Sequence, residues 1–530
     1  MFETRKRVKT KRFSKTLYAA AFAAAVLAAC GGDGSDGSGS QSWVGKPVEP
    51  AQNTTANNTA GGGKSNAAPG GTGATQNGSA GSGTSGKGAS GSGSSGSGSS
   101  GSGSSGSGSS GSGSSGSGTS GSGSSGTDSS SATDNPSSGG SPPDTPPASA
   151  PNVASIVIDN ALGVTVNQPY VTVKLCAPNA QSDSACVTVD HMLLDTGSIG
   201  VRVLANALGS SLTARLPQQT GASNDPSGAA PLAQCALFGS GYLWGSLRRA
   251  DVTIGGMTAR DIPVQIASDA AYPSTPADCE SRGVADLGTV NALGAKGVVG
   301  IGHRARDFPQ AAQTPLAATY YYCASATSCS AARVPLERQT INPVAGFATD
   351  NNGTIIRLPA LPADGQASVT GELIFGVGTR SNNALTANAK ILAVTDQGTL
   401  TTLYANRSVT GIVDSGTNGL LFRDTSIPTG VNDWYAPQNT LSLAATMMST
   451  IGLQAAVPFS IANADRLFTI GYAAHDNLGA LSLSSNMFVW GLPFYFGRSV
   501  YTVLSGAQAA TETGLKAGPF IAFQTLTYTR

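Results

Sequence analysis

Two stretches of this 530-residue chain match each other and decide its fold: Met192-Leu-Leu-Asp195-Thr-Gly-Ser-Ile-Gly200 and Gly411-Ile-Val-Asp414-Ser-Gly-Thr-Asn-Gly419. In each, apolar residues typical of a strand lead to an aspartate, then a hydroxyl residue, a glycine and a second hydroxyl residue. One such sequence is an ordinary turn, and two β-turns without chemistry are the simple alternative. Two copies that both follow apolar strands instead indicate a pair of matched sites.

A pair of aspartates at matched sites has a specific chemistry. Two carboxyl groups that lie close together cannot both ionise easily, so they share one proton. One of Asp195 and Asp414 can then accept a proton from water while the other donates a proton to a substrate carbonyl. Glycine lets the backbone approach closely, and the hydroxyl groups can form hydrogen bonds across the pair. The residues expected to support the pair are Thr196, Gly197, Ser198, Ser415, Gly416 and Thr417.

Further stretches resemble the pepsin-like aspartic peptidases and occur in the order of that family. Residues 238–256 resemble the flap hairpin, and Gly297-Val-Val-Gly-Ile-Gly302 resembles the strand beside the first catalytic loop. The remaining matches are Asn342-Pro-Val344, Gly371-Glu-Leu-Ile-Phe-Gly376, and Val489-Trp-Gly491 with Tyr501-Thr-Val503. Together the matches cover most of residues 186–505. The resemblance implies a bilobal, mostly-β fold with few short helices and an aspartic endopeptidase activity on polypeptides, without a metal or organic cofactor.

The sequence departs from the family pattern at the flap. The family's flap tyrosine falls on Phe238, and Tyr242 lies four residues further on, so both are flap candidates. The tryptophan that supports this tyrosine in the family falls near Arg202. These departures leave a second hypothesis open, in which the domain is a non-catalytic lipoprotein module that binds peptides or cell-wall fragments.

The first thirty residues predict export and a lipid anchor. A basic segment precedes thirteen apolar residues, Leu17 to Ala29, which suit a signal peptide. Leu27-Ala-Ala-Cys30 resembles the bacterial lipobox, which implies that residues 1–29 are removed and Cys30 is lipidated. The alternative is an ordinary cleavage site followed by an incidental cysteine. Because Gly31 follows the cysteine, resemblance to other lipoproteins favours the outer membrane, on its periplasmic or surface face. The chain also resembles an uncharacterised family of proteobacterial lipoproteins that carries this domain.

Composition predicts the domain organisation. Residues 30–150 are rich in Gly, Ser and Pro and cannot build an apolar core, so they are expected to be a disordered tether. The folded region is predicted to form an N-terminal lobe over 151–365 and a C-terminal lobe over 366–530, in a monomeric protein. Gln168–Leu175, Cys186–Leu194 and Asp251–Ile254 read as strands, and Leu441–Thr450 reads as the clearest helix.

Cysteine and charge counts bear on three further questions, which are disulfide bonding, metal binding and nucleic-acid binding. Six cysteines beyond Cys30 in an exported chain indicate three disulfides, for which fifteen pairings are possible. The short separations favour Cys176–Cys186 and Cys323–Cys329, which leaves Cys235–Cys279. A metal site is disfavoured, because the chain has no Cys-x-x-Cys pair and only three histidines. Without residues 1–29 the chain has 24 basic and 29 acidic residues, which argues against nucleic-acid binding as its function.

Overall fold

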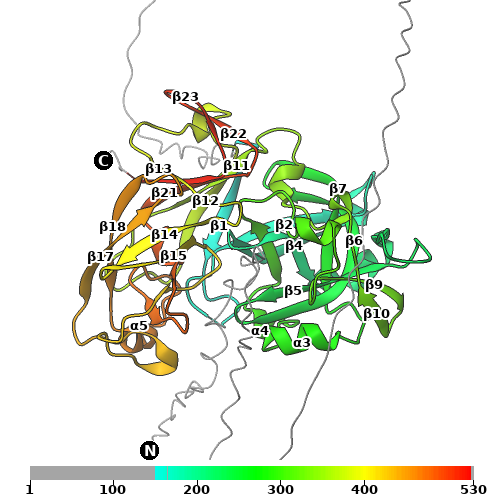
Figure 1. The fold of residues 1–530 in the computed structure, drawn as a ribbon, viewed down its shortest axis with the longest axis horizontal. Helices are drawn as coiled ribbons and strands as arrows, with labels where there is room; N and C mark the ends of the chain where they lie inside the picture. Colours follow the sequence, from blue (N-terminus) through cyan, green and yellow to red (C-terminus); the bar gives the residue numbers. More distant parts are fainter. Residues whose placement is uncertain (1–149, 164, 527–530) are drawn as a thin grey trace, which may run out of the picture. The chain divides into compact units, whose positions relative to one another are not determined.

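The computed structural model describes residues 150–163 and 165–526, and this part of the chain is mostly β-structure (Figure 1). The predicted signal peptide, Cys30 and nearly all of the predicted tether lie outside the described residues. The α-helices of the described part are short: α1 (Ala205–Leu208), α2 (Ser210–Arg215), α3 (Ala277–Gly283), α4 (Val290–Leu293) and α5 (Ala464–Ile470). In the described part, no helix has the length and apolar character needed to cross a membrane.

Six strands close on themselves into a barrel in the first half of the described chain. They follow one another in the sheet, and a further pairing of β6 with β2 closes the ring. In order they are β2 (Tyr170–Cys176), β3 (Cys186–Asp195), β8 (Gly297–Ile301), β4 (Ile199–Leu204), β7 (Met257–Ala267) and β6 (Gly241–Ile254). In β2, Val173 and Leu175 are buried and Thr172 is exposed, as expected of a strand with one face on a core. The three strands expected from the sequence are confirmed.

The same sheet continues on both sides of the barrel. Beyond β6 lie β5 (Leu232–Phe238), β9 (Tyr320–Ser325) and β10 (Ser328–Ala331). Beyond β2, an antiparallel run joins strands from the start, middle and end of the described chain, and several of them are labelled in the upper half of Figure 1. These strands are β1 (Val153–Ile158), β12 (Val369–Phe375), β11 (Gly353–Leu358), β21 (Arg498–Val503), β24 (Phe520–Thr525) and β13 (Lys390–Ala393).

A second, seven-stranded sheet is built entirely from residues after 398, and one separate hairpin completes the β-structure. The sheet contains, in order, β18 (Gln454–Ile461), β17 (Leu441–Met448), β14 (Thr399–Tyr404), β15 (Arg407–Val413), β20 (Met487–Trp490), β16 (Leu420–Phe422) and β19 (Gly479–Leu481). The hairpin is formed by β22 (Gln508–Thr511) and β23 (Gly514–Ala517). The predicted boundary between lobes at residues 365 and 366 stays a prediction.

The helix predicted over Leu441–Thr450 is wrong, because this segment forms strand β17 between β14 and β18. Its alternate residues Ala445 and Met447 are buried, whereas Ser442 is exposed. Leu, Ala and Met favour a helix in isolation. Here the segment forms hydrogen bonds to a strand on each side and buries alternate residues, and these tertiary interactions override the local preference for a helix.

Three disulfides stabilise the first half of the described chain, in the pairing that the short separations favoured. They join Cys176 to Cys186, Cys235 to Cys279, and Cys323 to Cys329. The first and third each connect paired neighbouring strands. The second joins β5 to helix α3 across 44 residues, and both of its cysteines are fully buried.

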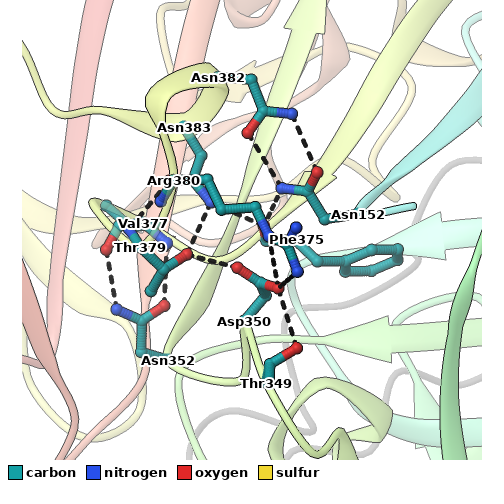
Figure 2. Close-up of polar contacts among 10 residues, drawn as sticks. All are labelled: Asn152, Thr349, Asp350, Asn352, Phe375, Val377, Thr379, Arg380, Asn382 and Asn383. Carbon is teal, nitrogen blue, oxygen red and sulfur yellow. Dashed lines mark hydrogen bonds and ion pairs between the residues drawn. The ribbon is translucent and has the colours of Figure 1, made fainter. Parts of the chain in front are cut away.

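A polar cluster fixes the loops beside the antiparallel run (Figure 2). The Asp350 carboxylate accepts hydrogen bonds from Arg380 Nε at 2.8 Å and Arg380 Nη2 at 2.7 Å, and from the Thr379 hydroxyl at 2.5 Å. The Asn352 side chain bonds both the N–H and the carbonyl of Val377 at 2.8 Å. Because these bonds are made within the cluster, we assign it to holding the ends of β11 and β12 together.

His303 joins the end of β8 to the end of β21. Its ring is buried, and Nδ1 donates a hydrogen bond to the Val503 carbonyl at 2.9 Å. A Cβ added at Gly398, in the turn between β13 and β14, would lie 2.7 Å from Cδ2 of the ring. The backbone of this turn therefore also packs against the ring. Burial lowers the pKa of His303 to about 4.

The first prediction concerns the large disulfide loop. Changing Cys235 and Cys279 together to Ala should lower the free energy of unfolding by about 4 kcal/mol in the chain-entropy estimate. The disulfide between Cys323 and Cys329 closes a loop of only six residues. Changing both of these cysteines to Ala should lower the free energy of unfolding by about 2 kcal/mol. Urea unfolding of the folded protein measures both. A larger loss for the short loop would contradict the chain-entropy explanation.

The second prediction concerns acid stability. Because the pKa of His303 is lowered in the folded state, the unfolded chain binds more protons between pH 6.5 and pH 4. The free energy of unfolding should therefore fall as the pH falls, by about 3 kcal/mol between pH 7 and pH 4 from this group. In His303→Asn the amide can replace the Nδ1 donor without titrating, so this component should vanish. If the free energy of unfolding fell equally with pH in the wild-type and His303→Asn proteins, this explanation would be refuted.

Candidate active site

The two aspartates stand at equivalent places in two similarly connected sets of strands. Asp195 is the last residue of β3, which runs parallel to β8, and Asp414 follows β15, which runs parallel to β20. After each aspartate the chain turns into a strand, β4 or β16, that pairs antiparallel with the same neighbour, β8 or β20. The two loops are therefore built in the same way, as their matching sequences predicted.

Each carboxylate is held by donors from its own loop. Asp195 accepts a hydrogen bond from the N–H of Gly197 at 2.8 Å and from the Ser198 hydroxyl at 2.5 Å. Asp414 accepts the equivalent bonds from the N–H of Gly416 at 2.9 Å and from the Thr417 hydroxyl at 2.6 Å. Such donors fix the carboxyl orientation and favour the ionised form.

The two loops are bonded to each other through Thr196 and Ser415. The N–H of Thr196 donates to Ser415 Oγ at 3.1 Å, and the N–H of Ser415 donates to Thr196 Oγ1 at 2.9 Å. Each hydroxyl donates onward to the strand before the opposite aspartate. Thr196 Oγ1 lies 3.2 Å from the Val413 carbonyl, and Ser415 Oγ lies 2.8 Å from the Leu194 carbonyl. All four bonds are buried, so they lock the two loops in one relative position.

The glycines of the two loops allow the carboxyl groups to meet. A Cβ added at Gly197 would lie 2.8 Å from Asp414 Oδ1, and a Cβ added at Gly416 would lie 2.7 Å from Asp195 Oδ1. Each carboxylate therefore lies against the glycine of the other loop, in space that no side chain could share. This close approach requires glycine at both positions.

Burial and mutual repulsion set the protonation of the pair. Asp195 is 2 % exposed and Asp414 is fully buried. Burial raises the pKa of Asp414 well above its ordinary value, and the charge and hydrogen bond of the Asp195 carboxyl raise it further, against the Thr417 and Gly416 donors. The pair is therefore arranged to hold one proton between its two carboxyl groups.

Tyr495 is a site residue that the sequence analysis missed. It follows the short 3₁₀ helix Leu492–Phe494, and its buried hydroxyl lies 2.9 Å from Thr196 Oγ1. Because the Thr196 hydroxyl donates to Val413, the Tyr495 hydroxyl acts as the donor in this bond. Burial raises the pKa of Tyr495, which keeps it neutral beside the two carboxyl groups. The only sequence signal was its position four residues after Gly491, which alone does not single it out.

The two flap candidates lie in different surroundings. Residues 232–254 form the hairpin β5–β6, and Phe238 pairs with Gly241 at its tip. Phe238 lines a pocket beside the Asp195 loop. Tyr242 packs instead with Trp244 and the Cys235–Cys279 disulfide, and is not among the pocket-lining residues.

A buried ion pair occupies the position where the family's supporting tryptophan was expected. The Arg202 guanidinium lies 5.8 Å from the centre of the Phe238 ring, within the range of a cation–π contact. Its Nη1 donates to the Ile199 carbonyl at 2.8 Å, and its Nη2 lies 3.8 Å from Asp307 Oδ2. The hairpin tip therefore rests on a charged group rather than on an aromatic ring.

Among the described residues, the structure contains no group of three or more His, Cys, Asp or Glu side chains suited to hold a metal ion. Two carboxyl groups that share one proton can act as an acid and a base toward a third group.

Comparison with known proteins gives a family without an assigned function. No curated protein matches the sequence. Among solved structures, the aspartic proteinase from Irpex lacteus is 16 % identical over 71 % of this chain and 98 % of its own, with a TM-score of 0.41. Residues 148–523 match the family described as "Protein of unknown function (DUF3443)", which covers most of the chain. The chain therefore belongs to the DUF3443 family.

Proposed function

We propose that the domain is a bilobal, pepsin-like aspartic endopeptidase whose catalytic pair is Asp195 and Asp414. The observation that carries the proposal is the reciprocal bonding of the two loops through Thr196 and Ser415. Two unrelated β-turns have no reason to exchange four buried hydrogen bonds and bring two carboxyl groups against each other. A general acid and a general base at one point are what peptide hydrolysis requires.

The first chemical step uses the two carboxyl groups in opposite roles. A water held between them loses a proton to the ionised Asp195, and its oxygen attacks the peptide carbonyl carbon. Asp414 donates its proton to the carbonyl oxygen, so the product of this step is a neutral tetrahedral diol. The raised pKa of Asp414 supports its assignment as the acid.

The second step breaks the peptide bond. Asp195 returns its proton to the amide nitrogen, which makes it a leaving amine, and Asp414 takes back a proton from one hydroxyl as the carbonyl re-forms. The C–N bond breaks, and the pair again holds one proton. The donors from Ser198 and Thr417 keep both carboxyls in place throughout the cycle.

A second function, peptide or cell-wall binding without cleavage, is favoured by one observation. Phe238 carries no hydroxyl, and it packs in a small core with Leu204 and Leu243 at the hairpin tip. A flap residue packed in this way can cover a bound ligand, but it contributes no polar group to a reaction. The cleavage assay below separates the two functions.

The third prediction tests the catalytic pair. Asp195→Asn and Asp414→Asn should each reduce cleavage of unfolded casein by on the order of 10³-fold or more, because each removes one half of the acid–base pair. The double variant should cost little more, since the two residues act as a unit. Activity should fall as the pH rises through the raised pKa of Asp414, and again at low pH when both carboxyls are protonated.

The matched control is Asp364→Asn, which alters an exposed carboxylate that pairs with Arg466 at the surface. It should leave the cleavage rate unchanged, because exposed ion pairs contribute little. Peptide binding by the wild-type protein with no cleavage at any pH would favour the binding function. Cleavage that survives either dyad substitution would refute the proposed mechanism.

The proposal places this domain in the cell envelope, held to the outer membrane by acyl chains on Cys30 and a tether of about 120 residues. The lipobox resemblance of Leu27-Ala-Ala-Cys30 supports this location. A flexible tether of this length would let a monomeric domain reach polypeptides well away from its anchor.

The fourth prediction tests the anchor. Cys30→Ala should abolish labelling with radioactive palmitate and move the protein from the membrane fraction to the soluble fraction, because the acyl chains provide the hold on the bilayer. Ser35→Ala, a nearby change that leaves the cysteine intact, should keep both properties. Membrane fractionation of the Cys30→Ala protein at the level of the Ser35→Ala protein would contradict the proposed anchor.

A further inference from the structure

A pocket adjoins the Asp195 loop and draws its walls from four segments. They are residues 196–199 of the loop with Arg202 of the strand that follows it, 236–238 at the end of β5, 302–304 with 307 and 308 after β8, and 396–397 in the turn between β13 and β14. Because Thr196, Gly197 and Ser198 line the pocket directly after Asp195, a peptide that lies across the proposed dyad would pass beside it. The charges in its walls therefore bear on which peptides bind.

Two of the four charged residues in the pocket neutralise each other. Asp307 is buried, and it lies 3.8 Å from Arg202 Nη2. Its remaining acceptor positions are taken by Gln234 Nε2 at 2.5 Å, the Tyr320 hydroxyl and the N–H of Phe308. This carboxylate is fully engaged inside the protein.

The third charge, Asp396, is directed to solvent. It is exposed, and its Oδ1 accepts a hydrogen bond from the Ser505 hydroxyl at 2.6 Å. Water screens its effect on the rest of the pocket. Asp396 therefore neither closes the pocket with an ion pair nor excludes an anion from its deeper part.

The fourth charge, Arg304, is the one without a partner. Within residues 150–163 and 165–526, its guanidinium has no side-chain hydrogen bond and no carboxylate within 4.0 Å, although the residue is partly buried. Burial lowers the pKa of Arg304, with Asp307 and Asp396 opposing the shift from a distance. A partly buried guanidinium without a partner gains from a carboxylate, which it can bind through two parallel hydrogen bonds.

We propose that Arg304 binds the carboxylate of an aspartate or glutamate side chain of the peptide ligand, so that the site selects acidic peptides. This inference rests on the proposed function, because the peptide must lie across Asp195 and Asp414. It applies equally to a peptide that is bound and cleaved and to one that is only bound. Arg304 is a specificity residue, and the chemistry stays with the two aspartates.

The test measures binding, which does not require cleavage. The full-length Asp414→Asn protein is immobilised and exposed to an equimolar library of random octapeptides, and the retained peptides are sequenced by mass spectrometry. Peptides with Glu or Asp should be enriched about tenfold over those with Gln or Asn at one position, as expected for a charge-assisted hydrogen bond. Arg304→Gln in the same background should abolish the enrichment, and Arg304→Lys should retain part of it.

Arg306→Gln is the matched control. Arg306 lies two residues away, donates to the Gln339 carbonyl at 2.7 Å, and is not among the pocket-lining residues, so its loss should leave the enrichment unchanged. No acidic enrichment in the parent protein, or the same enrichment in Arg304→Gln, overturns the inference. These outcomes are independent of the casein assay, so failure of the peptidase proposal and failure of the acidic preference are told apart.

Discussion

The exchange of hydrogen bonds between Thr196 and Ser415 is the constraint on which the rest of the site depends. The two aspartates come from different sheets, and no short segment of the chain links their loops. Each backbone N–H finds its acceptor on the hydroxyl of the opposite loop, and each hydroxyl donates a hydrogen bond to a carbonyl of the strand before the opposite aspartate. A shift of one loop by an ångström would break all four bonds together, so the carboxyl groups are held at a fixed separation.

This arrangement concentrates acidic groups in a place without solvent, and the surrounding residues compensate for it. Four donors bond the two carboxylates, and the neutral Tyr495 hydroxyl bonds the Thr196 hydroxyl of one loop. The buried Arg202 places a positive charge near the pair, balanced by Asp307. The proposed mechanism needs one proton shared by the two carboxyl groups, whereas the lowered pKa of the buried His303 makes the fold less stable as the pH falls.

The part of the site that the sequence predicted is the part encoded by local pattern. The aspartate stretches repeat within the chain, strands alternate over five or more residues, and short cysteine separations limit the disulfide pairing. Tyr495 could not be predicted in this way, because its role depends on the packing of a short 3₁₀ helix against a loop 299 residues earlier. The same holds for β17, where pairing on both sides outweighs a helical composition. The pocket around Arg304 is assembled from four segments far apart in the sequence, so no local pattern marks it.

The central claim is that Asp195 and Asp414 act on one substrate carbonyl. A crystal structure with a peptide mimic that carries a hydroxyl group in place of the scissile carbonyl tests it most directly. The account predicts that this hydroxyl lies within hydrogen-bonding distance of both carboxyl groups, with the Thr196 and Ser415 bonds intact. A mimic bound elsewhere, or carboxyl groups separated so that only one reaches the hydroxyl, would contradict it.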